Sequence, residues 1–210
     1  MIITGVGVSA GENEVFLYGS EGEKFRISAP DARRAGVYKY VEKPELLPEE
    51  ADSEMLEFMT AKLSCVKYAA YLLEFGDKSK KALTLKLKLK GYDSDVCEAA
   101  LAVLESNGII DDERLCGRKL VSIANSKLYG PYRLKSELIN KGFSSKQIDI
   151  AFEDAEIDFD ELLYKLVEKL TVRGFPRDEK GYSALKNKLI RYGYSYDSIS
   201  SVLSEYSDIE

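Results

Sequence analysis

Few side chains in this sequence are suited to catalysis. The 210 residues include no histidine, and histidine is both the commonest general base near neutral pH and the commonest metal ligand. No phosphate-binding motif of the form GxxxxGK(S/T) or GxGxxG follows a predicted strand. We therefore predict that the protein is not an enzyme and that it has no catalytic residue and no cofactor site.

One cluster of carboxylates and three thiols need a separate interpretation. Asp111-Asp112-Glu113 could hold Mg²⁺, but the free amides and dipole of a helix N-terminus also favour acidic residues. We interpret the cluster as a helix start and predict no metal site. The sequence has three cysteines, Cys65, Cys97 and Cys116, and no two of them form a CxxC motif. The odd count and the wide spacing argue against a disulfide framework and against a zinc site, and they favour buried thiols in a reducing cytoplasm.

Basic residues gather in the middle of the chain. Residues 64–152 carry 15 Lys and Arg against 11 Asp and Glu, although the whole chain has a net charge of −6. Lys86 with Lys90, and Arg114 with Arg118, are spaced i,i+4, so each pair forms one ridge that could meet phosphates or an acidic protein surface. The alternative is that these basic pairs lie on an ordinary solvent-exposed helix face and bind no partner. The predicted partner-binding residues are Lys86, Lys90, Arg114, Arg118, Lys119, Tyr132, Arg133, Lys135 and Lys141. For Tyr132, a place in the core is equally compatible with the sequence.

Three segments that align without gaps at steps of 51 residues must position these side chains: 81–101, 132–152 and 183–203. Each predicts a helix with two buried leucines four residues apart, then a glycine in the left-handed conformation, an aromatic residue and a second helix. The glycines are Gly91, Gly142 and Gly193. Serines near the second helix are predicted caps: Ser94, Ser144 or Ser145, and Ser195. One more helix precedes each pair, at 53–75, 112–127 and 160–173.

The start of the chain differs from the rest. Alternating apolar residues predict strands at 2–8, 14–19 and 23–28, and a connector with one short helix at 31–39 follows. The predicted fold is therefore mainly α, with three tandem three-helix repeats in an elongated array and a small N-terminal β-hairpin or meander. The expected domains are the N-terminal region 1–50 and the repeats 51–107, 108–157 and 158–210. No apolar run reaches 18 residues, so no membrane span or secretion signal is expected.

Two stretches resemble the RecX family, the regulatory proteins of the RecA recombinase. Gly108 to Arg114 reads GIIDDER, and Tyr129 to Gly142 reads YGPYRLKSELINKG; the resemblance covers about residues 60 to 205. It departs from the family pattern at Ala82 and Lys188, where the family usually has glutamate.

The resemblance implies a monomeric cytoplasmic protein that lies in the groove of a RecA filament on single-stranded DNA. It would inhibit the recombinase, ATPase and co-protease activities, and so act in homologous recombination, DNA repair and the SOS response. A weak contact with single-stranded DNA is part of this expectation. An autonomous DNA-binding protein of helix-turn-helix type is the alternative, since three-helix units resemble such modules.

Overall fold

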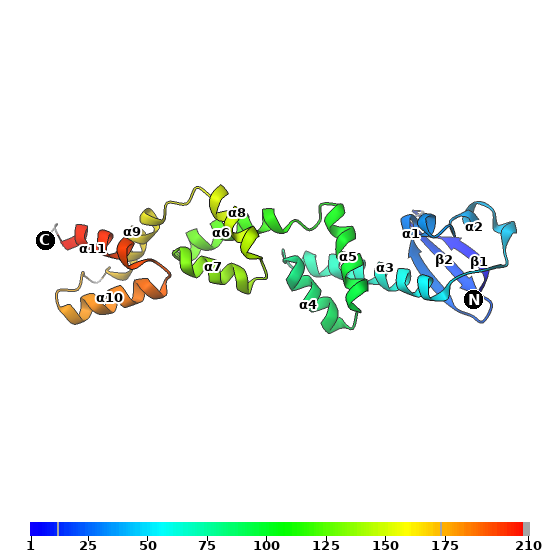
Figure 1. Cartoon of the computed structure of the whole chain (residues 1–210), viewed down its shortest axis with the longest axis horizontal. Coiled ribbons are helices and arrows are strands. Elements are labelled where there is room, and N and C mark those ends of the chain that lie inside the picture. Colours follow the sequence, from blue (N-terminus) through cyan, green and yellow to red (C-terminus); the bar gives the residue numbers. More distant parts are fainter. Residues whose placement is uncertain (12, 173, 208–210) are drawn as a thin grey trace. The chain divides into compact units, whose positions relative to one another are not determined.

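Alternating apolar residues near the start of the chain form a small antiparallel sheet in the computed structural model, which describes residues 1–11, 13–172 and 174–207 (Figure 1). The strands are β1 Ile2–Val8, β2 Glu14–Gly19, β3 Lys24–Ser28 and β4 Glu49–Glu50, in the order β3-β2-β1-β4. Val15, Leu17 and Ile27 are fully buried, as the alternation requires. The three predicted strands are confirmed, whereas β4 was not predicted because two glutamates carry no strand pattern.

The segment between β3 and β4 is more broken than predicted. The single helix expected at 31–39 is wrong: α1 spans Ala29–Arg34, α2 spans Lys39–Glu42, and a 3-10 turn follows at Pro44–Leu46. Gly36 lies between the helices with φ 72°, a conformation that ends a helix. The Ser28 hydroxyl accepts from the Asp31 amide and caps α1.

The chain divides into two compact units. The N-terminal unit comprises Met1–Asp77 and Leu83–Ile110, and the C-terminal unit comprises Lys78–Ala82 and the described residues from Asp111 onward. Helix α4 therefore begins in one unit and continues in the other. Among the described residues, no helix is both long enough and apolar enough to cross a membrane.

The helices of the N-terminal unit after the sheet region are α3 Ser53–Glu74, α4 Lys80–Lys90 from Leu83 onward, and α5 Ser94–Ser106. Helix α3 contributes to two cores, since Leu56 packs under the sheet and Cys65 packs among the helices. The leucines Leu83 and Leu87 of α4 are fully buried, which confirms the predicted stripe.

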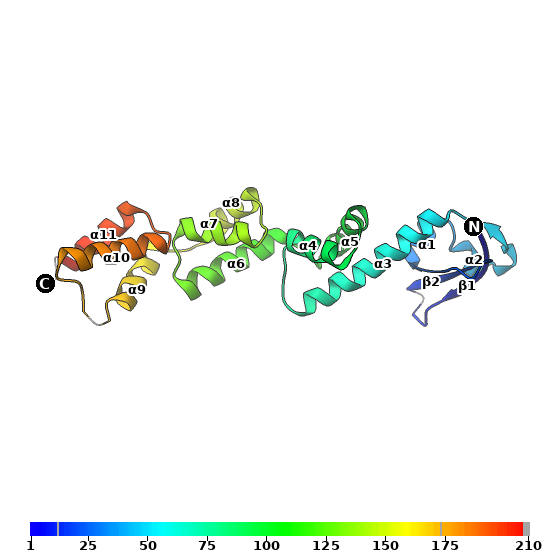
Figure 2. The same ribbon diagram turned by 90° about the horizontal axis from the view of Figure 1, so that it is seen from below.

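Two further cores form in the C-terminal unit. One lies among α6 Asp112–Lys127, α7 Pro131–Asn140 and α8 Ser145–Asp154, and the other among α9 Phe159–Leu170, α10 Glu179–Arg191 and α11 Tyr196–Ser207 (Figure 2). The predicted leucines of α7 and α10 are buried in these cores. The helix expected at 160–173 ends earlier, at Leu170, and residue 173 lies outside the described residues.

The serine caps agree with the prediction at two of three places. The Ser144 hydroxyl accepts from the Gln147 amide in a capping box, and the Ser195 hydroxyl accepts from the Ser198 amide. The prediction for Ser94 is wrong, because Asp93 holds the cap position of α5 and Ser94 is the first helical residue. Asp93 is also the residue that stands 51 positions before Ser144.

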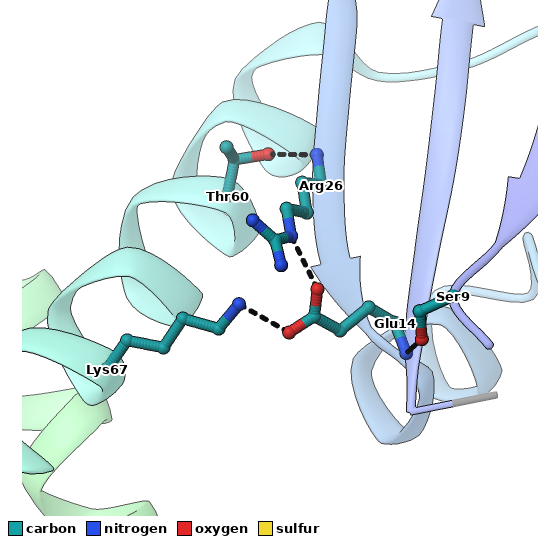
Figure 3. Close-up of polar contacts among 5 residues, drawn as sticks. All are labelled: Ser9, Glu14, Arg26, Thr60 and Lys67. Atoms are coloured by element: carbon teal, nitrogen blue, oxygen red, sulfur yellow. Dashed lines mark hydrogen bonds and ion pairs between the residues drawn. The ribbon is translucent and has the colours of Figure 1, made fainter. Parts of the chain in front are cut away.

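A polar cluster ties the sheet to α3 (Figure 3). The Glu14 carboxylate, which is largely buried, pairs with Arg26 of β3 and lies 2.5 Å from the Lys67 Nζ of α3. The Arg26 amide donates to the Thr60 hydroxyl at 3.3 Å, and the Glu14 amide donates to the Ser9 hydroxyl at 3.2 Å. Burial opposes ionisation of Glu14 but is outweighed by Lys67 and Arg26, so the pKa of Glu14 lies below its usual value of 4.5.

A second ion pair between α1 and α3 lies deeper in the same unit. The Lys62 Nζ is 2.5 Å from Asp31 Oδ1, and both side chains are buried. The other Asp31 oxygen accepts from the Ser28 hydroxyl at 2.7 Å. Both charges therefore have partners, as burial of ionised groups requires.

We predict that Glu14→Gln destabilises the N-terminal unit by about 1–2 kcal/mol at neutral pH, because two cations lose their carboxylate. Since folding lowers the pKa of Glu14, its contribution is full above pH 4.5 and is lost as pH falls through the lower folded pKa. Urea unfolding of both proteins across pH should show a difference that shrinks below this value. A constant difference down to strongly acidic pH would contradict the assignment.

Candidate partner-binding surface

The predicted contact residues of α4 flank a groove. Lys86 and Lys90 are exposed, and together with Tyr68, Leu72 and Leu89 they line a depression of about 250 Å³, which we call the α3–α4 groove. The Lys90 Nζ lies 5.4 Å from the centre of the Tyr68 ring, within the range of a cation–π interaction. The groove thus combines two positive charges with an apolar floor.

Several apolar side chains on α3 and α4 and at the end of α3 are exposed, among them Leu89 of the α3–α4 groove. Tyr71 is 49% exposed, Phe75 69%, Leu85 58% and Leu89 88%. The Tyr71 ring near the end of α3 lies 4.9 Å from the ring of Phe75, which directly follows the helix, edge to face. These two aromatic residues were not predicted as contact residues. Their spacing of four residues along the predicted helix, shortly before the basic run of α4, could have indicated an exposed apolar patch.

The basic residues of α6 differ in exposure. Arg114 and Arg118 are exposed, whereas Lys119 is half-buried. They lie within one helix whose other face packs in the core through Leu115 and Cys116. Arg114 and Arg118 therefore form an outward ridge, as the i,i+4 spacing predicts.

The acidic cluster at the start of α6 has structural partners. The Asp111 carboxylate accepts from the Arg114 amide at 2.9 Å and caps the helix, as predicted. The Asp112 carboxylate accepts from the Lys80 amide at 2.9 Å. Among the described residues, no three His, Cys, Asp or Glu side chains are grouped so as to hold a metal ion.

A serine near the start of the chain fits a nucleophile motif by sequence alone. Gly7 to Gly11 reads GVSAG, which matches the form GxSxG. That motif works on a turn from a strand to a helix, with a histidine nearby. Here Ser9 follows β1 in the connection to strand β2, accepts from Glu14, and has no histidine in the chain to activate it. The arrangement offers no nucleophile.

The predicted contact residues Tyr132, Lys135 and Lys141, on α7 and directly after it, are all exposed. Tyr132 is 66% exposed, so the alternative of a core position is wrong. Lys141 is also exposed, and its backbone carbonyl accepts from the Ser79 hydroxyl at 2.6 Å. Lys135 lies 3.1 Å from Asp149 on α8, an exposed pair that adds little stability.

Arg133 makes contacts within the C-terminal unit. Its Nη1 donates to the Arg191 carbonyl at 2.9 Å, and its guanidinium lies 4.4 Å from the centre of the Tyr129 ring. Glu137 lies 3.9 Å from its Nε. Arg133 thus helps to fasten α7 to α10.

Backbone hydrogen bonds complete this fastening. The Gly130 amide donates to the Tyr192 carbonyl at 2.9 Å, and the Tyr132 amide donates to the Gly193 carbonyl at 3.1 Å. A Cβ on Gly193 would lie 2.4 Å from the Arg133 nitrogen. The start of α7 therefore docks against the glycine end of α10, and we call this contact the α7–α10 joint.

A related contact lies 51 residues earlier, at the α4–α7 joint, where a side-chain hydroxyl takes the place of the backbone amide as donor. The Ser79 hydroxyl donates to the Lys141 carbonyl, and a Cβ on Gly142 would lie 2.6 Å from that hydroxyl oxygen. Ser79, Lys141 and Gly142 stand 51 residues before Gly130, Tyr192 and Gly193. Both joints lie within the C-terminal unit, because it includes Lys78–Ala82.

All three cysteines are buried, as predicted. Burial raises the pKa of Cys65 to about 12 and that of Cys116 to about 11, and it also raises the pKa of Cys97. Because the thiolate is the reactive form, these side chains belong to the core.

Comparison with known proteins identifies several relatives. No family model matches the chain. Three bacterial proteins named "Regulatory protein RecX" are similar to it: that of Pseudomonas fluorescens is 33% identical over 122 residues (58% of this chain, 78% of the relative), that of Streptococcus gordonii 30% over 207 (91% and 79%), and that of Haemophilus ducreyi 36% over 149 (71% and 94%).

Solved structures share the fold. A crystal structure of regulatory protein RecX aligns with a TM-score of 0.75 at 17% identity and covers 97% of this chain and 100% of its own. RecX from Lactobacillus salivarius aligns with a TM-score of 0.58 at 19% identity and covers 69% and 96%. The relatives are named as regulatory proteins, not as enzymes.

We predict that alanine substitutions will separate the left-handed conformation of a glycine from the close approach that glycine allows in the α7–α10 joint, with Gly91 outside the joint as the reference. Gly91→Ala should cost about 1–2 kcal/mol, because Gly91 has φ 104° but open space around it. Gly193→Ala should cost clearly more, because its Cβ also meets backbone atoms. Gly130→Ala, at φ −75°, tests the close approach alone. Urea unfolding measures all three, and equal losses for Gly91→Ala and Gly193→Ala would contradict the joint.

Proposed function

This chain belongs to the RecX family of regulatory proteins, and from that premise we propose that it binds the RecA filament on single-stranded DNA and inhibits its activities. The affected activities are strand exchange, ATP hydrolysis and co-protease function. The protein acts as a cytoplasmic monomer with a role in recombination, repair and the SOS response. Its direct contact with single-stranded DNA is weak, consistent with a net charge of −6.

The recurrence of one joint at a step of 51 residues is the observation that carries this proposal. It supports three equivalent modules, α3–α5, α6–α8 and α9–α11, which correspond to domains 51–107, 108–157 and 158–210 after the N-terminal region 1–50. A filament presents the same surface at regular intervals. Like modules that recur at a regular step in the sequence can each contact a successive subunit, and weak contacts then add through effective concentration.

The exposed basic residues supply the proposed contact surface. Helix α4 contributes Lys86 and Lys90, and α6 contributes Arg114 and Arg118 with the half-buried Lys119. Around α7 the contacts are Tyr132, Lys135 and Lys141. Arg133 serves mainly to hold the α7–α10 joint, and supports the surface through the helix that it positions.

We predict that the protein will inhibit strand exchange and ATP hydrolysis by the cognate recombinase at stoichiometric amounts. Arg114→Glu with Lys141→Glu should weaken inhibition by about tenfold or more, because both charges face an acidic partner. Lys24→Glu with Lys180→Glu changes the net charge equally at exposed sites outside the proposed surface and should leave inhibition unchanged. Absence of inhibition by the unmodified protein would refute the proposed function.

Autonomous DNA binding remains the rival function, and salt dependence distinguishes it. If roughly six phosphates were neutralised, the logarithm of affinity for bare DNA would fall with that of salt at a slope near −5. We predict weak binding with a much shallower slope, measured by fluorescence anisotropy with a labelled oligonucleotide. A steep slope with nanomolar affinity at low salt would favour the rival.

A further inference from the structure

The end of α4 matches the two helix ends that form joints. Lys90 and Gly91 stand 51 residues before Lys141 and Gly142. Gly91 has φ 104°, close to the 97° of Gly142 and the 95° of Gly193. The backbone therefore leaves all three helices in the same left-handed conformation.

Of these three equivalent helix ends, the end of α4 is the one without a docked segment among the described residues. Apart from its chain neighbours, no described residue lies within 4 Å of the place that a Cβ on Gly91 would occupy, whereas Gly142 and Gly193 both contact the start of another helix. The α3–α4 groove lies beside this end, since Lys90 lines it. The end of α4 therefore has the same backbone conformation as the two helix ends that receive another helix start, but no segment is docked on it. We call such a helix end an acceptor.

The residue types also differ between the vacant and the occupied acceptors. Leu89 is 88% exposed, and the residues 51 and 102 positions later are Asn140 and Arg191. Where a helix start is docked, the position is polar. Where none is docked, it is a leucine at the edge of the groove, which is the pattern expected of a surface that a partner covers.

A second copy of this chain is poorly suited to fill the vacancy. The residue equivalent to Gly130 at the start of α10 is Gly181. Its amide donates to Asp178 Oδ1 at 2.9 Å, and a Cβ there would lie 3.0 Å from Pro176. The segment before α10 therefore already covers the group that would have to dock.

The chemistry of the acceptor defines the occupant. A helix C-terminus presents carbonyl oxygens and partial negative charge, so it needs N–H donors and disfavours phosphates. Lys86 and Lys90 stand beside it, and α4 contains no acidic residue to neutralise them. Tyr68 and Leu72 line the groove, with the exposed Leu89 at its edge, and offer apolar surface and room for one large side chain.

We propose that the end of α4 and the α3–α4 groove form a docking site for an acidic helix N-terminus of a partner protein. The partner's amides meet the α4 carbonyls, its acidic first turn meets Lys86 and Lys90, and one large apolar side chain enters the groove. This inference rests on the proposed function only in requiring a protein partner. Its test uses no recombinase, so the two can fail independently.

The experiment measures binding of a fluorescein-labelled helical peptide to the full chain by anisotropy. The peptide has Asp and Glu in its first turn and a single Phe, and a control peptide has Lys in place of each acid. The acidic peptide should bind and the basic one should not. Lys86→Glu with Lys90→Glu should weaken binding by about tenfold or more, and Leu89→Ser should weaken it independently of charge.

Matched controls keep the result interpretable. Lys24→Glu with Lys180→Glu should bind the peptide as the unmodified chain does, and circular dichroism should show every variant folded. Leu89→Ser should remain folded, because an exposed leucine contributes little to the core. A loss of peptide binding in this variant therefore cannot be attributed to misfolding. Absence of peptide binding, equal binding by Lys86→Glu with Lys90→Glu, or displacement by an oligothymidine that binds more tightly would each overturn the proposal.

Discussion

The docking of one helix start on another helix end depends on a glycine that ends a helix in the left-handed conformation and that has no Cβ to block the close approach. Gly193 meets both requirements, since its φ is 95° and the Arg133 backbone nitrogen lies where a Cβ would be. A left-handed turn alone would tolerate asparagine. The close approach admits glycine alone, and it lets the backbone of one helix start bond directly to the carbonyls of another helix end.

The joints use backbone amides, the Ser79 hydroxyl and one long side chain, that of Arg133, and they leave the side chains of Tyr132, Lys135 and Lys141 outside. At the α7–α10 joint the amides of Gly130 and Tyr132 carry the contact, while the Tyr132 ring stays exposed. Each small core needs only its own leucines, and Lys135 and Lys141 remain on the surface. The ion pair of Lys135 with Asp149 is exposed and therefore weak, so a partner can replace it at little cost.

Local patterns were predictable from the sequence, and distant contacts were not. The leucines, Gly142 and the Asp111 cap follow from periods and cap positions within a few residues. Strand β4 and the break at Gly36 were missed because they depend on the fold of the N-terminal unit. Arg133 was read as a contact residue because nothing local indicates its bond to Arg191, which is 58 residues away. The groove was missed because its walls come from two helices.

The sequence of α4 itself argues that its outer face has a use beyond folding. Leucines occur at every second position in LTLKLKL, residues 83–89, and a step of two residues turns a helix by about 200°. One stripe, Leu83 and Leu87, therefore fills the core, and the other, Leu85 and Leu89, must point to solvent. A helix that needed only a core would gain from polar residues on the second stripe. The alternation instead places exposed apolar area beside Lys86 and Lys90.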